Sequence, residues 1–283
     1  MATTDTVGQT SSPEASSNIE IRDVTLEHPW RWLAAGTRDF AQAPFTSFAY
    51  GLAITLLSFA ITLALFAAGL QHWLLPLAAG FMFVGPLLAV GFYDISRRLE
   101  RGEPPTLAAA AAAWKSNPVQ ISLMGLTLMI FFLFWVRLAT LLFAVFFGNI
   151  PTGLTGLVEA TLTIQGVSFL ALGGAIGGVL AFLAFSLSVV SIPLLVDRQS
   201  TFMDAITASL QAVYRNLDAM LLWAALLAAF TIAGIVTFYI GLAIVLPLLG
   251  HASWHAYRDM VAPEQPAQGS AAESETETEP NAT

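Results

Sequence analysis

The chain has 283 residues, of which 56% are hydrophobic and only 11% are charged, whereas soluble domains are about 25% charged. This composition excludes an ordinary soluble fold and indicates an integral membrane protein. The net charge of −8 argues against nucleic-acid binding, and the lack of cysteine excludes disulfides, thiolate metal sites and iron–sulfur clusters.

The negative charge is concentrated in the two ends of the sequence, 1–18 and 262–283. Both are rich in Ser, Thr, Pro, Gln and Glu, and together they hold seven of the 19 acidic residues and no basic residue. Such segments bury too little apolar surface to offset the entropy of ordering. We expect two disordered tails flanking a nearly neutral membrane domain, 19–261, with 12 acidic and 11 basic residues.

The apolar runs define the membrane-crossing segments, since a helix needs about 20 apolar residues to cross the hydrocarbon core. Four runs meet this requirement, at 47–70, 72–93, 119–147 and 166–196. A fifth run, 219–257, is long enough to fold back as two helices with a turn near 234–241. The sequence therefore predicts an all-α polytopic membrane protein with six transmembrane helices.

Amphipathic segments precede the odd-numbered spans and are expected to lie in the membrane interface. These segments are 28–40, 94–117 and 197–218. In the first, Trp30, Leu33 and Phe40 share one side of a helix. In the third, apolar residues recur with helical spacing at Phe202, Ile206, Leu210 and Val213 or Tyr214.

Basic residues fix the expected orientation. Ten of the 11 flank the spans at one common end: Arg22, Arg31, Arg38, Arg97, Arg98, Arg101, Lys115, Arg198, Arg215 and Arg258. Because short cytoplasmic loops carry the excess of Lys and Arg, both termini are predicted to be cytoplasmic, in a bacterial inner membrane.

An internal repeat is indicated by three copies of Pro-Leu-Leu, which begin at Pro86, Pro193 and Pro247, each near the cytoplasmic end of an even-numbered span. We interpret the domain as three hairpin units, each preceded by an interfacial helix. A proline inside a helix frees a carbonyl four residues earlier, which needs a partner. In repeat-built transporters such interruptions line the binding site, so the prolines are pathway candidates; kinked packing helices are the alternative.

Arg137 is the one charged residue inside a predicted span. It lies about 27 Å along its helix counted from Val119, near the outer boundary of the bilayer. There it can extend to the interface beside Trp135 or pair with Glu159, the one acidic residue expected on that face. An anion or proton path is the functional alternative.

His251 and His255 are four residues apart, so on a helix they share a face and can hold one metal ion or a haem. A third ligand would come from Asp94 or Asp197, both expected at the cytoplasmic side. The alternative is a hydrogen-bonded pair in an interfacial aromatic belt. No cofactor is required by the rest of the sequence.

Glycines at Gly-xxx-Gly spacing in the fourth span indicate close approach of another helix. They are Gly173, Gly174, Gly177 and Gly178. We expect them to pack within the chain rather than to form a dimer.

Several motifs also carry a family resemblance. They are GPLLAVGFYDISRRLERG at 85–102, WVRLA at 135–139, PLLVDR at 193–198 and PLLGHASWHAYR at 247–258. With these motifs the chain, over about 28–260, is similar to the bacterial integral membrane family catalogued as domain of unknown function 2189. The resemblance implies a location and a fold but no activity.

The sequence favours a non-enzymatic membrane protein, because no nucleophile–base pair, phosphate loop or dinucleotide motif is recognisable. A small-solute or ion permease and a scaffold for another membrane complex are the two forms of this hypothesis. Its partners would be the bilayer and either another membrane protein or a second copy. The alternative is a metal- or haem-binding membrane protein that uses His251 and His255.

Overall fold

The structure of the protein is a computed structural model that describes residues 19–148 and 162–263. Within these residues every regular element is a helix, and a single antiparallel bridge joins Ile21 to Val261. The predicted all-α class is therefore confirmed. The predicted tails 1–18 and 262–283 lie outside the described residues except for Ala262 and Pro263.

Five helical segments are long and apolar enough to cross a membrane. They are α2 (Pro44–Ala67); η1 (Gln71–Trp73) with α3 (Leu74–Leu88) and α4 (Val90–Glu100); α6 (Pro118–Phe146); α8 (Ile164–Ser188) with α9 (Ser191–Asp197); and α11 (Leu217–Val236). Prolines at the first turns of α2 and α6 fit there because those positions need no intrahelical N–H donor. The helices coincide with the apolar runs of the sequence.

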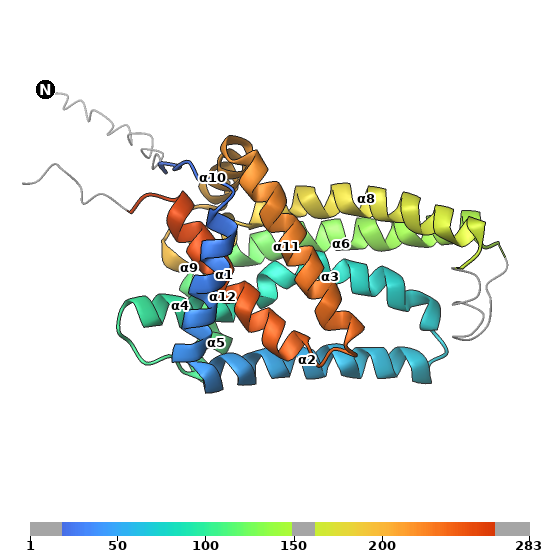
Figure 1. Ribbon diagram of the computed structural model, residues 1–283, viewed down its shortest axis with the longest axis horizontal. Helices are drawn as coiled ribbons and strands as arrows, with labels where there is room; N and C mark the ends of the chain where they lie inside the picture. The colour runs from blue at the N-terminus through green and yellow to red at the C-terminus, as the bar shows by residue number, and fades with distance from the viewer. Residues whose placement is uncertain (1–18, 149–161, 264–283) are drawn as a thin grey trace, which may run out of the picture.

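The last helix, α12 (Leu242–Met260), is not among these five segments. Its first half is apolar, but its second half carries His251, His255 and Arg258 and is mostly buried in the protein. A turn joins it to α11, and Phe238 and Tyr239 in that turn have positive φ angles of 53° and 66°. In Figure 1 the tip of this α11–α12 hairpin ends short of the far ends of α2, α6 and α8. The count of six transmembrane helices remains a prediction.

Shorter helices gather at one end of the bundle, at the left of Figure 1. They are α1 (His28–Gln42), α5 (Leu107–Ala112), η2 (Ala113–Ser116) and α10 (Phe202–Arg215). Thr106 and Thr201 cap α5 and α10 by accepting hydrogen bonds from the N–H groups of Ala109 and Asp204. In Figure 1, α1 runs across the axis of the long helices.

The face that α1 buries differs from the face of large apolar residues noted in its sequence. Trp32, Ala35, Gly36 and Asp39 point into the protein because α1 packs against α12. Trp30 is 56% exposed on the other side.

In α10, too, the small residues are buried and some of the large apolar residues are exposed. Its buried residues are small, namely Ala205, Ala208, Ser209, Ala212 and Val213. Leu210 and Tyr214 are exposed, at 43% and 85%. Small residues allow close approach of helices, so packing is decided by them, and the large apolar side chains remain outside.

Each Pro-Leu-Leu proline is accommodated differently. Pro193 cannot bond to the carbonyl of Val189, and the chain breaks there between α8 and α9. Ser209 of α10 bridges this break, since its hydroxyl donates to the Ser186 carbonyl (2.7 Å) and accepts from the Val190 N–H (3.2 Å).

Pro86 lies inside α3 just before its junction with α4, and Pro247 lies inside α12. Pro247 packs on Gly51 of α2, where a Cβ atom would lie 2.7 Å from the proline ring and 3.0 Å from the Ala243 carbonyl oxygen. The carbonyl that Pro247 frees therefore faces a glycine rather than a side chain.

Helices α3, α6 and α8 form one side of the bundle. Trp135 of α6 contacts both α3 and α8. Its indole N–H donates to the Pro76 carbonyl of α3 (2.8 Å), and its ring fills the space over Gly177 of α8. On the other side, α12 packs against α1, α2, α4 and α11. The two sides diverge between α8 and α11, which creates the cavity described below.

Candidate functional site

His251 is fully buried, and both of its ring nitrogens have partners. Nδ1 lies 2.8 Å from Ser96 Oγ, and Nε2 lies 2.9 Å from Ser47 Oγ. The Ser96 hydroxyl donates to Asp39 Oδ2 at 2.6 Å, so its oxygen accepts from an Nδ1–H group, and Nε2 accepts from Ser47. We assign a neutral imidazole protonated on Nδ1 from this hydrogen-bond pattern.

His255 completes the cluster through Asp39, with its Nε2 atom 2.9 Å from the same Oδ2 oxygen. Burial alone would raise the pKa of Asp39, but the hydrogen bonds from His255 and Ser96 outweigh it and hold the pKa below its ordinary value. Asp39 is therefore ionised at neutral pH. We call Asp39, Ser47, Ser96, His251 and His255 the histidine network; it joins α1, α2, α4 and α12.

Asp94 and Asp197, the two residues proposed as a third ligand to a metal at the histidines, bind other side chains in the structure. Asp94 binds the guanidinium groups of Arg97 and Arg98, at 2.5 and 2.7 Å. Asp197 accepts from the Tyr257 hydroxyl (2.8 Å) and pairs with Arg258 (3.3 Å). Residues 19–148 and 162–263 contain no group of three His, Asp or Glu residues placed to hold a metal ion.

Metal or haem binding by His251 and His255 stays a prediction. In the structure the carboxylate beside the pair is that of Asp39, and a metal would have to displace the serine hydroxyls from the ring of His251.

Sequence reasoning missed three members of this network. Asp39 had a detectable signal, because it is the one acidic residue of the amphipathic helix α1. Ser47 had none, since isolated serines are common in apolar helices, and Ser96 was marked only as part of the motif at 85–102. Ser47 and His251 resemble a nucleophile and its base, but both are fully buried and neither lines the cavity. A substrate has no access to them, so the pair does not support a hydrolase.

Arg137 lies on α6, about 28 Å from the start of that helix. Its side chain is exposed and makes no hydrogen bond or ion pair with another described residue. Glu159, its predicted partner, lies outside the described residues. The position at the outer surface of the bundle is the one expected for a side chain that extends to the interface.

The glycines of α8 divide into two groups. Gly177 packs against Trp135, where a Cβ atom would lie 2.8 Å from the ring. Gly173, Gly174 and Gly178 have open space where a side chain would begin. Close packing within the described chain therefore uses one of the four glycines, and Gly178 instead borders the cavity.

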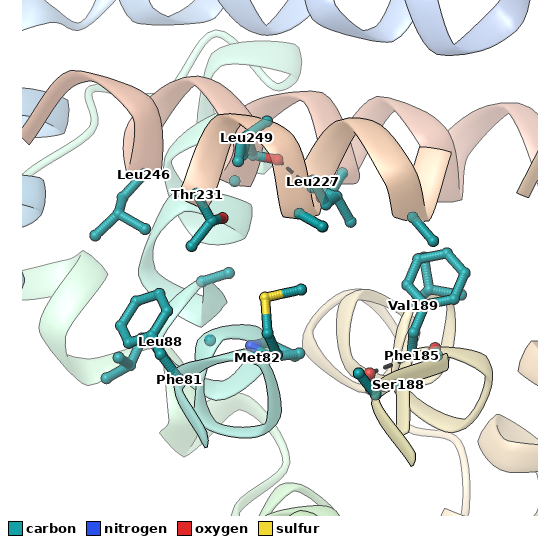
Figure 2. Close-up of a pocket in the computed structure, with 18 of the residues that line it drawn as sticks. Phe81, Met82, Leu88, Phe185, Ser188, Val189, Leu227, Thr231, Leu246 and Leu249 are labelled. Carbon is teal, nitrogen blue, oxygen red and sulfur yellow. Dashed lines mark hydrogen bonds between the residues drawn. The ribbon is translucent and has the colours of Figure 1, made fainter. Parts of the chain in front are cut away.

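An apolar cavity of about 410 Å³ lies between α3, α8, α11 and α12. Figure 2 shows its two walls, with Thr231, Leu246 and Leu249 on one side and Phe81, Met82 and Phe185 on the other. Pro86 and Gly178 also line it. The sequence singled out these last two residues but gave no sign that they share a cavity.

Few polar groups and no charged residue line this cavity. Tyr93, Ser188 and Ser253 lie toward the end that carries the basic residues. The Ser253 hydroxyl donates to the Leu249 carbonyl at 2.8 Å, and that of Ser188 to Phe185 at 3.4 Å. Thr231 is alone at the other end; it is 7% exposed, and its hydroxyl makes no hydrogen bond to a described residue.

Comparison with known proteins agrees with this architecture. Residues 74–197 match the model of a family described as "Predicted integral membrane protein (DUF2189)". The chain is an integral membrane protein. The predicted resemblance is thereby confirmed for α3 to α9, a narrower range than the motifs had indicated. No curated protein and no solved structure matches the chain.

The matched segment contributes one wall of the cavity, α3 and α8, and one member of the histidine network, Ser96. Helices α1, α11 and α12 lie outside it. The histidines and the second wall of the cavity therefore come from parts of the chain that the family model does not cover.

Proposed function

We propose that the protein binds a small apolar or amphipathic molecule from the bilayer and moves it as a permease or carrier, without chemical conversion. The cavity between α3, α8, α11 and α12 is the observation that supports this function. Its volume, about 410 Å³, falls within the range of about 300–1,000 Å³ typical of small-molecule sites. Its lining is almost entirely apolar, and such a surface gains dispersion contacts from an apolar occupant.

The lining separates this proposal from an ion permease. An ion inside the membrane needs charged side chains or a ring of polar groups to replace its hydration. The cavity has four hydroxyl side chains and no charge. The charged residues nearest to it belong to the histidine network and to the ion pairs of α4, α9 and α12, which bond to one another. A scaffold for another complex would require no such cavity.

Filling the cavity should abolish binding without disturbing the fold. The probe is a photoreactive sixteen-carbon alcohol with a diazirine in its chain, used on the protein in lipid nanodiscs. We expect labelled peptides from α8 and α11, and an approximately tenfold lower yield in Ala181→Phe, since one extra aromatic ring occupies much of the space.

Val179→Phe is the matched control, because Val179 lies on the same helix but is 63% exposed and does not line the cavity. Its labelling should equal that of the wild type. Equal labelling of the cavity in both variants, or labelling confined to lipid-facing residues, would contradict the proposed function.

We further propose that both termini lie in the cytoplasm of a bacterial inner membrane. The basic residues of the flanking segments support this orientation. The bridge between Ile21 and Val261 supports it too, because it holds the two ends of the described chain together. A reporter fused near residue 155 should read periplasmic, and one near residue 104 cytoplasmic. A cytoplasmic reading at 155 would overturn the topology.

The three hairpin units with their interfacial helices belong to the same proposal. Exposed aromatic residues on α1, η2 and α10, namely Trp30, Trp114 and Tyr214, are suited to the headgroup region. We propose that the third hairpin is shorter than the others, with the Leu242–Leu249 half of α12 as its returning segment. The repeat of Pro86, Pro193 and Pro247 is part of this proposal.

A further inference from the structure

We infer that the molecule held in the cavity is a neutral lipid with one hydrogen-bonding oxygen, such as a long-chain alcohol, ketone or isoprenoid alcohol, and that Thr231 binds that oxygen. This inference rests on the proposed function and names its substrate class. Three observations support it: the Thr231 hydroxyl has no hydrogen bond to a described residue, the cavity lining has no charged residue, and the cavity opens beside Gly178.

The Thr231 hydroxyl makes no hydrogen bond to a described residue, unlike most threonines in the long helices. A threonine inside a helix usually donates to the carbonyl four residues earlier. In this chain Thr62, Thr127 and Thr140 do so, at 2.7–3.0 Å. Thr231 makes no such bond although the residue is only 7% exposed. In the hydrocarbon layer, where no water supplies a partner, a hydroxyl without a hydrogen bond costs about 1–3 kcal/mol, which a ligand oxygen would remove.

Figure 2 shows the Thr231 side chain directed into the space between the two walls. Thr55 of α2 also has a hydroxyl without a partner, but its oxygen is fully enclosed and does not line the cavity. Thr231 is therefore the unpartnered hydroxyl that a molecule in the cavity can reach.

The charge and size of the cavity restrict the molecule further. With no Lys, Arg or His in the lining, a carboxylate or phosphate group would be buried without a counter-charge, at a large desolvation cost. The volume of about 410 Å³ lies near the lower limit for drug-sized ligands. It fits one chain or a compact ring system rather than a two-chain phospholipid.

The opening of the cavity faces the bilayer. Gly178 lines the cavity and is exposed, and Gly174 lies one turn further along α8 with open space around it. Small residues of α11, including Ala228, form the other side. A lipid-soluble molecule can therefore enter sideways from the hydrocarbon layer, which suits a ligand that partitions into the membrane.

Competition against the photoreactive alcohol tests the inference. Hexadecanol, hexadecane and hexadecanoate are added in turn to the full-length protein in nanodiscs. Hexadecanol should compete about tenfold better than either of the others, as expected for one hydrogen bond of up to about 1.5 kcal/mol. Thr231→Val should remove this preference while cavity labelling persists, and Thr231→Ser should retain it.

The outcomes separate the two proposals. No labelling of the wild-type cavity overturns the proposed function and this inference with it. If the cavity is labelled, three results would overturn the neutral-lipid assignment alone. They are equal competition by hexadecane and hexadecanol, hexadecanoate as the best competitor, and a preference for hexadecanol that persists in Thr231→Val. Gly178→Leu should slow labelling several-fold without altering the order of the competitors; a rate equal to that of the wild type would overturn the lateral opening.

Discussion

His251→Ala is expected to lower the free energy of unfolding by about 3–5 kcal/mol, the largest effect of any single truncation in the histidine network. The imidazole is fully buried and is the shared partner of Ser47 and Ser96. Its removal leaves the Ser47 hydroxyl without its acceptor, at about 1–3 kcal/mol, and takes the Nδ1–H donor from the Ser96 oxygen, which still donates to Asp39. It also creates a void that cannot collapse fully. Thermal unfolding in detergent, followed by tryptophan fluorescence, measures the loss.

His255→Ala provides the matched comparison, since it lies one turn along the same helix and its side chain is 23% exposed. Water can replace it beside Asp39, so we expect a loss of only about 1 kcal/mol. Ser47→Ala combined with His251→Ala should be less destabilising than the sum of the two single changes, because both remove the same bond. A loss below about 1 kcal/mol for His251→Ala, or equal losses for the two histidines, would show that the network does not hold the helices together.

The helices of this protein were predictable because hydropathy alone determines where a chain can cross a bilayer. Runs such as 119–147 became α6, Pro118–Phe146, with ends shifted by one residue. Helix α10, Phe202–Arg215, lies inside the expected segment 197–218 and begins at the first of its helically spaced apolar residues. These features depend on neighbouring residues in the sequence, and so a single sequence contains them.

The site depends instead on which helix faces meet. Asp39 and His255 are 216 positions apart in the sequence and touch because α1 crosses α12. The spacing of His251 and His255 correctly indicated one helix, but the metal hypothesis assumed that their rings were free. The serines that hold His251 are on α2 and α4, and nothing in the local sequence relates either of them to a histidine.

The cavity was unpredictable for a related reason. It exists because α11 and α12 diverge from α8, and its lining residues are ordinary apolar ones. The glycines of α8 predicted close packing of a neighbouring helix, which holds at Gly177 on Trp135. At Gly174 and Gly178 the same residue type leaves open space. Glycine spacing shows where a helix can approach, and the rest of the fold decides whether one does.

The crossing of α1 and α12 supports the second large expected effect, a loss of about 1–3 kcal/mol of unfolding free energy in Gly36→Ala. A Cβ atom at Gly36 would lie 2.7 Å from both the Ala252 nitrogen and the Leu248 carbonyl oxygen. These are backbone atoms of α12, so relief requires one helix to move away from the other. The loss should appear despite the gain of about 1 kcal/mol that alanine brings over glycine inside a helix.

Gly174→Ala isolates that gain, since nothing lies within 4 Å of the added methyl group. It should leave the melting temperature unchanged or raise it, opposite in sign to Gly36→Ala. Changes of the same sign would mean that the crossing at Gly36 is not close in solution. Because Asp39 lies one turn beyond Gly36 on the same buried face, a displaced α1 would also lengthen the Asp39–His255 bond. Gly36→Ala and His255→Ala should then be less than additive, which connects the backbone crossing to the histidine network.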